Sequence, residues 1–136
     1  MAKGGTTPLM GVYEYAQQVT ACGFTFMDTP GYDPVATTGQ VAGGCNLVIF
    51  TTGRGSCFGY KPAPSIKICT NTEVYERMTD DMDVNAGRVL EGVPMRQAAA
   101  ELLDLAIAVA SGQPSKSEAQ DVGEAEFVPW NLGGVL

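Results

Sequence analysis

One arginine flanked by glycines is the part of this sequence best suited to bind an anion. The run Thr52-Gly53-Arg54-Gly55-Ser56 follows the apolar residues 47–50. Glycines let a backbone approach a ligand closely, and a planar guanidinium can hold a carboxylate through two parallel hydrogen bonds. The run therefore indicates a site for a carboxylate. It is also compatible with a glycine turn that carries a solvated arginine.

Asp28 and Thr29 form a second candidate pair, placed just after the apolar residues 24–27. The carboxylate could ligate a metal ion or accept a hydrogen bond from a hydroxyl group, and the threonine could donate one. An aspartate ahead of a Pro-Gly pair also commonly bonds its own backbone in a turn. Both interpretations remain open at this position.

The composition excludes several other kinds of site. The chain has 8 Lys and Arg against 15 Asp and Glu, which leaves no basic stripe to neutralise a phosphate backbone, so nucleic acid is not expected as a partner. It contains no histidine, so a Ser-His or Cys-His nucleophile cannot be assembled. Cys22, Cys45, Cys57 and Cys69 form no CxxC pair, and we expect them to be reduced and structural. Cys22 and Cys69 are expected to be buried beside strands.

No membrane-targeting feature is visible in the sequence. No apolar run approaches the roughly 20 residues that span a bilayer. The residues after Met1 do not form the apolar core of a signal peptide. We therefore expect a cytoplasmic protein without a membrane partner.

Apolar periodicity predicts the elements that must position these residues. Helices are expected at 8–20, 34–43, about 71–78 and 94–111, and strands at 24–27, 46–51 and 65–69. The strand over 46–51 carries a continuous apolar run, which is typical of a strand buried on both faces.

The alternation of helices and strands predicts an α/β fold. We expect a mostly parallel sheet with helices on both faces, in a three-layer, Rossmann-like arrangement. A single domain should cover 1–112, and the tail over 113–136 should be extended and pack on this domain or a neighbouring one. In parallel sheets ligands bind beyond the carboxyl ends of the strands, so the loops after Met27, Thr51 and Cys69 are the expected site.

Several segments taken together resemble one enzyme family. They are 26–34 (FMDTPGYDP), 38–44 (TGQVAGG), 50–56 (FTTGRGS), 61–72 (KPAPSIKICTNT) and 80–87 (DDMDVNAG). In this order they resemble the C-terminal region of altronate and galactarate dehydratases, and the similarity runs from about residue 9 to 112 and loosely to 130. Sulfolactate sulfo-lyase belongs to a related branch of this family.

The resemblance implies a hydro-lyase of sugar-acid catabolism. Such enzymes dehydrate hexarates or hexonates to 2-keto-3-deoxy acids, usually with Fe²⁺ or another divalent metal. The reaction needs a base for the proton α to the carboxylate, an acid for the departing hydroxide, and a group that stabilises the aci-carboxylate intermediate. Arg54 fits the last, catalytic role. Substrate contacts are then expected from Asp28, Thr29, Thr52, Gly53, Arg54, Gly55, Ser56 and Asn71.

Family members are several times longer and carry an N-terminal SAF-type domain and a middle region. We therefore expect this chain to be a fragment that is inactive alone, with metal ligands and the principal base supplied mostly by the missing domains. Its partners would be those domains, a small sugar acid and, in a homo-oligomer, further copies. Two alternatives remain: a non-catalytic module or subunit that binds a small anion, and a subunit like that of sulfolactate sulfo-lyase.

Overall fold

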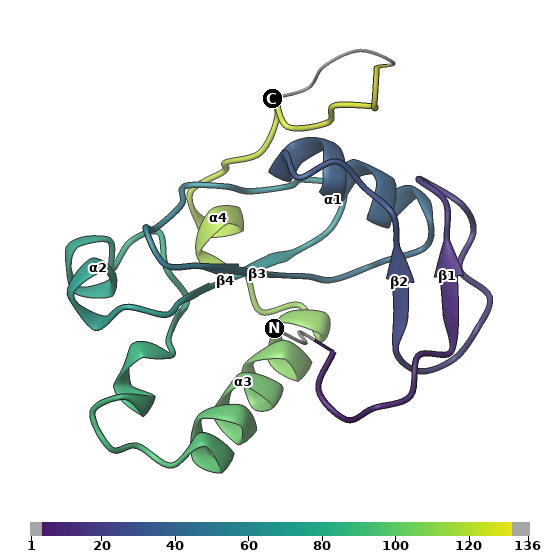
Figure 1. Ribbon diagram of the computed structural model, residues 1–136. Coiled ribbons are helices and arrows are strands. Elements are labelled where there is room, and N and C mark those ends of the chain that lie inside the picture. The colour runs from purple at the N-terminus through teal and green to yellow at the C-terminus, as the bar shows by residue number, and fades with distance from the viewer. Residues whose placement is uncertain (1–3, 132–136) are drawn as a thin grey trace. The chain divides into compact units, whose positions relative to one another are not determined.

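The computed structural model describes residues 4–131 and divides into two compact units. The first unit is drawn from Met1–Asn46 and Ala125–Leu136, and the second is Leu47–Glu124. Among the described residues, the first unit contains a two-stranded sheet and one helix, the second a three-stranded sheet with several helices, and every strand pair is parallel (Figure 1). The expected α/β class with parallel strands is therefore confirmed. The three-layer, Rossmann-like arrangement stays a prediction, as does the division at residue 112.

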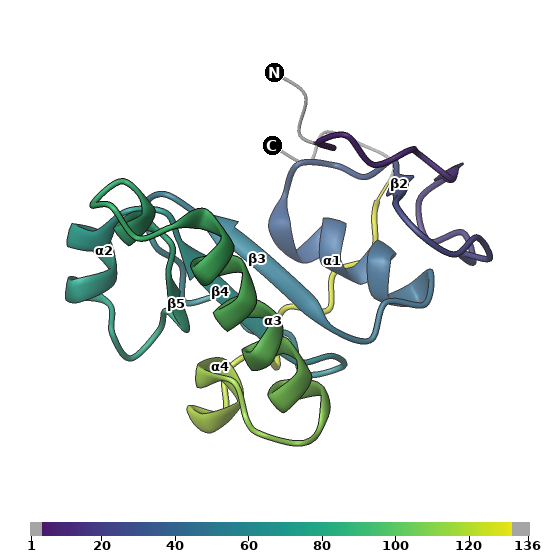
Figure 2. The same cartoon turned by 90° about the horizontal axis from the view of Figure 1, so that it is seen from below.

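The second unit is built on a three-stranded parallel sheet. The strand order is β3 (Val48–Thr52), β4 (Ser65–Cys69) and β5 (Val84–Asn85). Helix α2 (Thr72–Arg77) connects β4 to β5, and the 3-10 helix η1 (Gly87–Val89) follows β5. Helices α3 (Met95–Ala110) and α4 (Lys116–Ala119) complete the unit, with α3 running alongside the sheet (Figure 2).

The core of this unit centres on β4 and not on β3. Every residue of β4 is buried, because β4 has a neighbouring strand on each side. Strand β3 alternates instead, with Val48 buried and Ile49 46% exposed. The expectation that β3 is buried on both faces is wrong, since β3 is an edge strand of the described sheet and part of its apolar face is uncovered.

Helix α3 follows the predicted helix over 94–111 closely. Pro94 precedes its first turn, and Gly112, with a φ of +104°, stands just after its end, where a residue without Cβ adopts the left-handed conformation at little cost. Ala98 and Val109 are buried on the face directed at the sheet.

The first unit differs from expectation at its start. Residues 8–20 were expected to form a helix, but Gly11–Tyr13 is strand β1, paired in parallel with β2 (Thr25–Met27). The chain turns at Ala16, which has a φ of +60°, and the amides of Thr20 and Ala21 then donate to the Tyr13 hydroxyl. Pairing with a strand distant in sequence therefore overrides the helical periodicity.

Helix α1 (Asp33–Ala42) confirms the helix expected at 34–43, with Pro34 in its first turn. Gly39 of this helix has no room for a Cβ, because the Tyr15 ring lies against it. Trp130 meets the Tyr15 ring edge-on at a centroid distance of 5.4 Å. The Val128 amide donates to the Thr38 hydroxyl at 3.1 Å. The end of the described chain thus packs within the first unit.

All four cysteines are free. Cys69 is buried in β4, and its thiol donates to the Asn71 carbonyl. Cys22 is exposed, so its expected burial is wrong: residues 22–24 form the exposed approach to β2. Within residues 4–131, no helix has the length and apolar character needed to cross a membrane.

Candidate functional site

The three parallel strands of the second unit bring three loops to one edge of the sheet. Thr52 pairs with Cys69 and Cys69 with Asn85, so the loops after β3, β4 and β5 begin at the same level. The Thr70 amide donates to the Thr52 carbonyl at 2.9 Å, and the Ala86 amide to the Cys69 carbonyl at 2.8 Å. This edge is where parallel sheets place ligands, and it holds most of the predicted site residues.

A tight turn carries Arg54 at the end of β3. The Thr52 hydroxyl accepts the Arg54 amide at 3.3 Å and lies 3.4 Å from the Gly55 carbonyl, to which it donates. Arg54 is exposed, and among the described residues no carboxylate forms a salt bridge with it. Its guanidinium is therefore available to an external anion.

Gly55 is required by the shape of this turn. Its φ is +85°, and a Cβ at this position would collide with the sulfur of Met78. It would also lie 3.2 Å from a methyl group of Val74. Both neighbours belong to α2 or its C-terminal cap, so the glycine lets the arginine turn pack directly on this helix.

Ser56 fixes the exit of the turn. Its hydroxyl accepts the Phe58 amide at 3.0 Å, which is a local side-chain turn. Phe58 stacks between Phe50 of β3 and Tyr60, at centroid distances of 5.3 and 6.4 Å. The aromatic stack anchors the residues that follow the turn.

Asn71 sits on the adjacent loop and caps α2. Its side-chain oxygen accepts the Val74 amide at 3.2 Å. Asn71 is therefore the N-cap residue, directly before Thr72 at the start of the helix. The capped helix is the one that carries Val74 and Met78 against Gly55. The cap therefore supports the arginine turn.

Three supporting residues of this edge were not among the predicted site residues. Asn85 bonds the Thr72 hydroxyl through its side-chain amide, and its oxygen accepts the Gly87 amide at 3.0 Å. Gly87 has no space for a Cβ, which would lie 2.5 Å from the Thr72 amide nitrogen. Strand β5 has only two residues, too few for a periodic pattern, although Gly87, two residues after it, is a turn signal.

Asp83, the residue directly before β5, is the third of these supporting residues. Its two carboxylate oxygens accept the amides of Lys67 at 2.7 Å and Lys116 at 2.9 Å. It therefore fastens the start of α4 to the central strand. Both carboxylate oxygens of Asp83 therefore have protein partners.

Asp28 and Thr29 lie at the end of β2, in the first unit. The Asp28 amide donates to the Tyr13 carbonyl at 2.9 Å, Asp28 is exposed, and Thr29 is half-buried. The structure thus brings together residues 52–56 and Asn71 in the second unit, while Asp28 and Thr29 belong to the other sheet. Their substrate contacts stay predictions.

The described residues do not fit a metal centre. Within residues 4–131, no three His, Cys, Asp or Glu side chains are grouped so that they could hold a metal ion. A divalent metal would need several oxygen or nitrogen ligands converging on one point. No chemical step is therefore assigned to a metal held by this part of the chain.

Comparisons with known proteins agree on one family. The model described as D-galactarate/altronate dehydratase, C-terminal, matches residues 1–135. An altronate dehydratase of Bacillus subtilis (strain 168) is 38% identical over 123 residues, covering 90% of this chain and 24% of that protein. A galactarate dehydratase (L-threo-forming) of Escherichia coli (strain K12) is 37% identical over 114 residues, covering 83% and 22%.

A lyase of a different name is also similar. The (2R)-sulfolactate sulfo-lyase subunit beta of Chromohalobacter salexigens is 31% identical over 119 residues, covering 87% of this chain and 30% of that protein. The chain thus spans about a quarter of the length of the two dehydratases.

Proposed function

The chain belongs to the D-galactarate/altronate dehydratase family and corresponds to its C-terminal part, and from this premise we propose that it is the C-terminal domain of a sugar-acid hydro-lyase. The proposed reaction removes water from a hexarate or hexonate, such as galactarate or altronate, and gives a 2-keto-3-deoxy acid. The proposed role of this domain in the reaction is to bind the substrate carboxylate and nearby hydroxyl groups.

The exposed Arg54 at the carboxyl edge of a parallel sheet carries this proposal. It has the charge and planar geometry to hold a carboxylate, and its turn is fixed by the Thr52 hydroxyl and by packing of Gly55 on α2. When a base removes the proton α to the carboxylate, negative charge spreads onto the carboxylate oxygens. A guanidinium already in place stabilises this aci-carboxylate more than the substrate, which lowers the barrier.

The other residues of the edge have supporting roles in the proposal. Gly53 and Gly55 let the backbone approach the acid, and Ser56 and Asn71 carry polar groups that can bond its hydroxyls. Asp28 and Thr29 of the first unit would supply further hydroxyl contacts. The base, the acid for the departing hydroxide and any divalent metal, including Fe²⁺, are assigned to the rest of the enzyme. The domain alone is then expected to be inactive.

The similarity to a sulfo-lyase subunit favours a second candidate. The proposed arginine site would serve equally for sulfolactate, because elimination of sulfite also begins at a carbon next to a carboxylate. A non-catalytic module that binds a small organic anion through Arg54 is the third candidate. All three share the carboxylate contact. The first two differ in the group that leaves, and the third involves no reaction.

The choice among them is tested with the full-length enzyme that carries this domain. Galactarate, altronate and sulfolactate are supplied separately with ferrous iron, and the 2-keto acid and sulfite are measured. Formation of a 2-keto-3-deoxy acid from either sugar acid supports the proposal. Release of sulfite together with pyruvate from sulfolactate, with no product from either sugar acid, supports the second candidate, and binding without turnover of any acid supports the third.

A further inference from the structure

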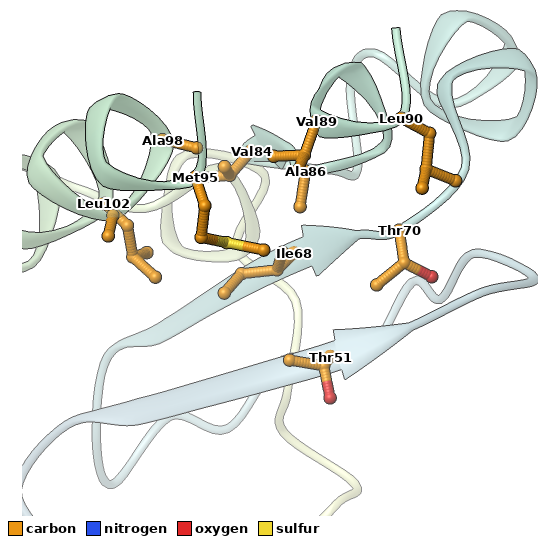
Figure 3. A pocket seen from close by; sticks show the side chains of 11 residues that line it. Thr51, Ile68, Thr70, Val84, Ala86, Val89, Leu90, Met95, Ala98 and Leu102 are labelled. Carbon is orange, nitrogen blue, oxygen red and sulfur yellow. The ribbon is translucent and has the colours of Figure 1, made fainter. Parts of the chain in front are cut away.

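An apolar groove in the second unit is left open between α3 and the edge of the sheet. Its volume is about 410 Å³, and its floor includes Ile68 of β4 and Thr51 of β3. Figure 3 shows Met95 and Leu90 pointing toward the sheet, with Thr51 on the other side of the opening. Apolar side chains form almost all of the wall, so the groove suits an apolar occupant.

The helix layer stops short of β3. In the parallel register Ile49 lies beside Ile66 and Thr51 beside Ile68, so the four residues share one face of the sheet. Ile66 and Ile68 are buried, whereas Ile49 and Thr51 are exposed. The described helices therefore cover this face over β4 and leave it bare over β3.

Helix α3 presents a second apolar stripe beside this uncovered face of β3. Met95, Ala99, Leu103 and Ile107 recur every four residues and form a single ridge. Met95 is 67%, Leu103 60% and Ile107 57% exposed, and Met95 and Ala99 also line the groove. A ridge at this spacing is the surface that packs into a groove of another helix. The open space thus has a sheet floor and a helix wall.

We propose that an amphipathic helix from the rest of the dehydratase polypeptide packs in this groove and completes the helix layer over β3. The inference rests on the proposed function, because it takes the chain as one domain of a longer enzyme. About three quarters of each dehydratase relative lies outside the matched region, which is ample chain to supply such a helix. Thr51 directly precedes Thr52, so the docked helix lies next to the turn that carries Arg54.

Methionine oxidation tests this docking, because two methionines of the second unit differ in exposure. Met95 is on the ridge, and Met82 is 0% exposed and serves as the internal control. The 136-residue chain and the full-length enzyme are treated with dilute hydrogen peroxide, and each methionine sulfoxide is followed by peptide mass spectrometry. We expect Met95 to react at least tenfold more slowly in the full-length enzyme, while Met82 is slow in both proteins.

A pair of matched variants assigns the protection to the ridge. Leu103→Glu places a charge on the ridge, and Gln97→Glu places the same charge on an exposed position of α3 away from it. In the full-length enzyme, Leu103→Glu should return Met95 oxidation to the rate of the 136-residue chain, and Gln97→Glu should not. Neither should change the melting temperature of the 136-residue chain by more than a few degrees, because Leu103 is exposed and Gln97→Glu loses only an exposed hydrogen bond from the Gln97 amide to Glu101.

Three results overturn the docking proposal. Equal Met95 oxidation in both proteins would leave the groove open in the enzyme. Slow oxidation in the 136-residue chain at every concentration would mean that this chain fills its own groove. Slow oxidation only at high concentration would assign the groove to a second copy. A full-length protein that protects Met95 but dehydrates no sugar acid would retain the docking and reject the proposed function.

Discussion

Gly55 packs so tightly against Met78 that a Cβ at its position would collide with the methionine sulfur. The φ of +85° at Gly55 adds a second restriction, because L-residues rarely adopt it. We therefore predict that Gly55→Ala lowers the free energy of unfolding by about 2–4 kcal/mol, through backbone strain and overpacking together. Urea denaturation followed by circular dichroism measures the loss.

Gly112→Ala is the matched control for this substitution. Gly112 also has a positive φ, +104°, but nothing lies within 4 Å of its Cβ position. Gly112→Ala should therefore lower the free energy of unfolding through backbone strain alone, by about 1–2 kcal/mol. Equal losses at the two glycines would show that Met78 moves aside freely and that the turn is not held by α2.

Substitutions of Asn71 can separate its effect on stability from its effect on activity. Asn71→Ala removes the acceptor for the Val74 amide and should cost about 1 kcal/mol of unfolding free energy, whereas Asn71→Ser retains a capping oxygen and should cost less. If Asn71 also bonds the substrate, both variants should raise KM in the full-length enzyme, because serine is too short to reach as far. If both variants lost stability but kept the wild-type KM, Asn71 would act only as the cap of α2.

Asp83 joins the central strand to α4 through two backbone amides. Asp83→Ala leaves both amides without this acceptor and should reduce the free energy of unfolding by about 2–3 kcal/mol. Asp83→Asn keeps one acceptor oxygen and should lose about half as much. The exposed neighbour Asp80→Ala should change stability by no more than about 0.5 kcal/mol. A similar small effect at Asp83 in thermal and urea unfolding would contradict its clamping role.

The pair of Asp121 and Lys61 makes stability depend on pH in a defined direction. The Lys61 ammonium, 2.8 Å away, lowers the pKa of Asp121 first through its hydrogen bond and then through its charge. A carboxyl whose folded pKa is lowered stabilises the fold above its unfolded pKa of about 4, and this contribution is lost as the pH falls through the folded pKa. Melting temperatures of wild type and Asp121→Asn should therefore differ near neutral pH and converge in acid.

Asn is suited to this comparison because it tolerates the left-handed backbone of Asp121, with a φ of +59°. Asp104→Asn, which removes an exposed carboxylate of α3 and leaves the Lys61 pair intact, is the matched control. The effect should be small, since Asp121 is exposed. A difference that grows as the pH falls would have the wrong sign and would refute the assignment.

Local patterns in the sequence predicted the second unit better than the first. The alternation over Ser65–Cys69 gave β4, and the long apolar periodicity after Pro94 gave α3, because both signals lie within the element itself. Gly11–Tyr13 was missed because its pairing with Thr25–Met27 depends on residues that are distant in sequence. The exposure of Ile49 was missed for a related reason, since strand order decides which strand has two neighbours.

The candidate site was predictable where it depends on strand ends. A parallel sheet must bring the loops after Thr52 and Cys69 to one edge, and the structure does so. The supporting bonds of Asn85 and Gly87 could not be predicted, because they depend on side chains meeting across two loops. The contacts of Asp28 and Thr29 with substrate remain predictions.

The most direct test of the central claim is the rate of dehydration by the full-length enzyme with Arg54 replaced. Arg54→Ala should lower kcat/KM for galactarate or altronate by about 100-fold, or about 2.7 kcal/mol of transition-state stabilisation. Arg54→Lys should recover only part of this loss, because an ammonium lacks the planar pair of donors. The fold should be unchanged, since the side chain is exposed. An unchanged kcat/KM in Arg54→Ala would contradict the account and leave the Gly-Arg-Gly run as a structural turn.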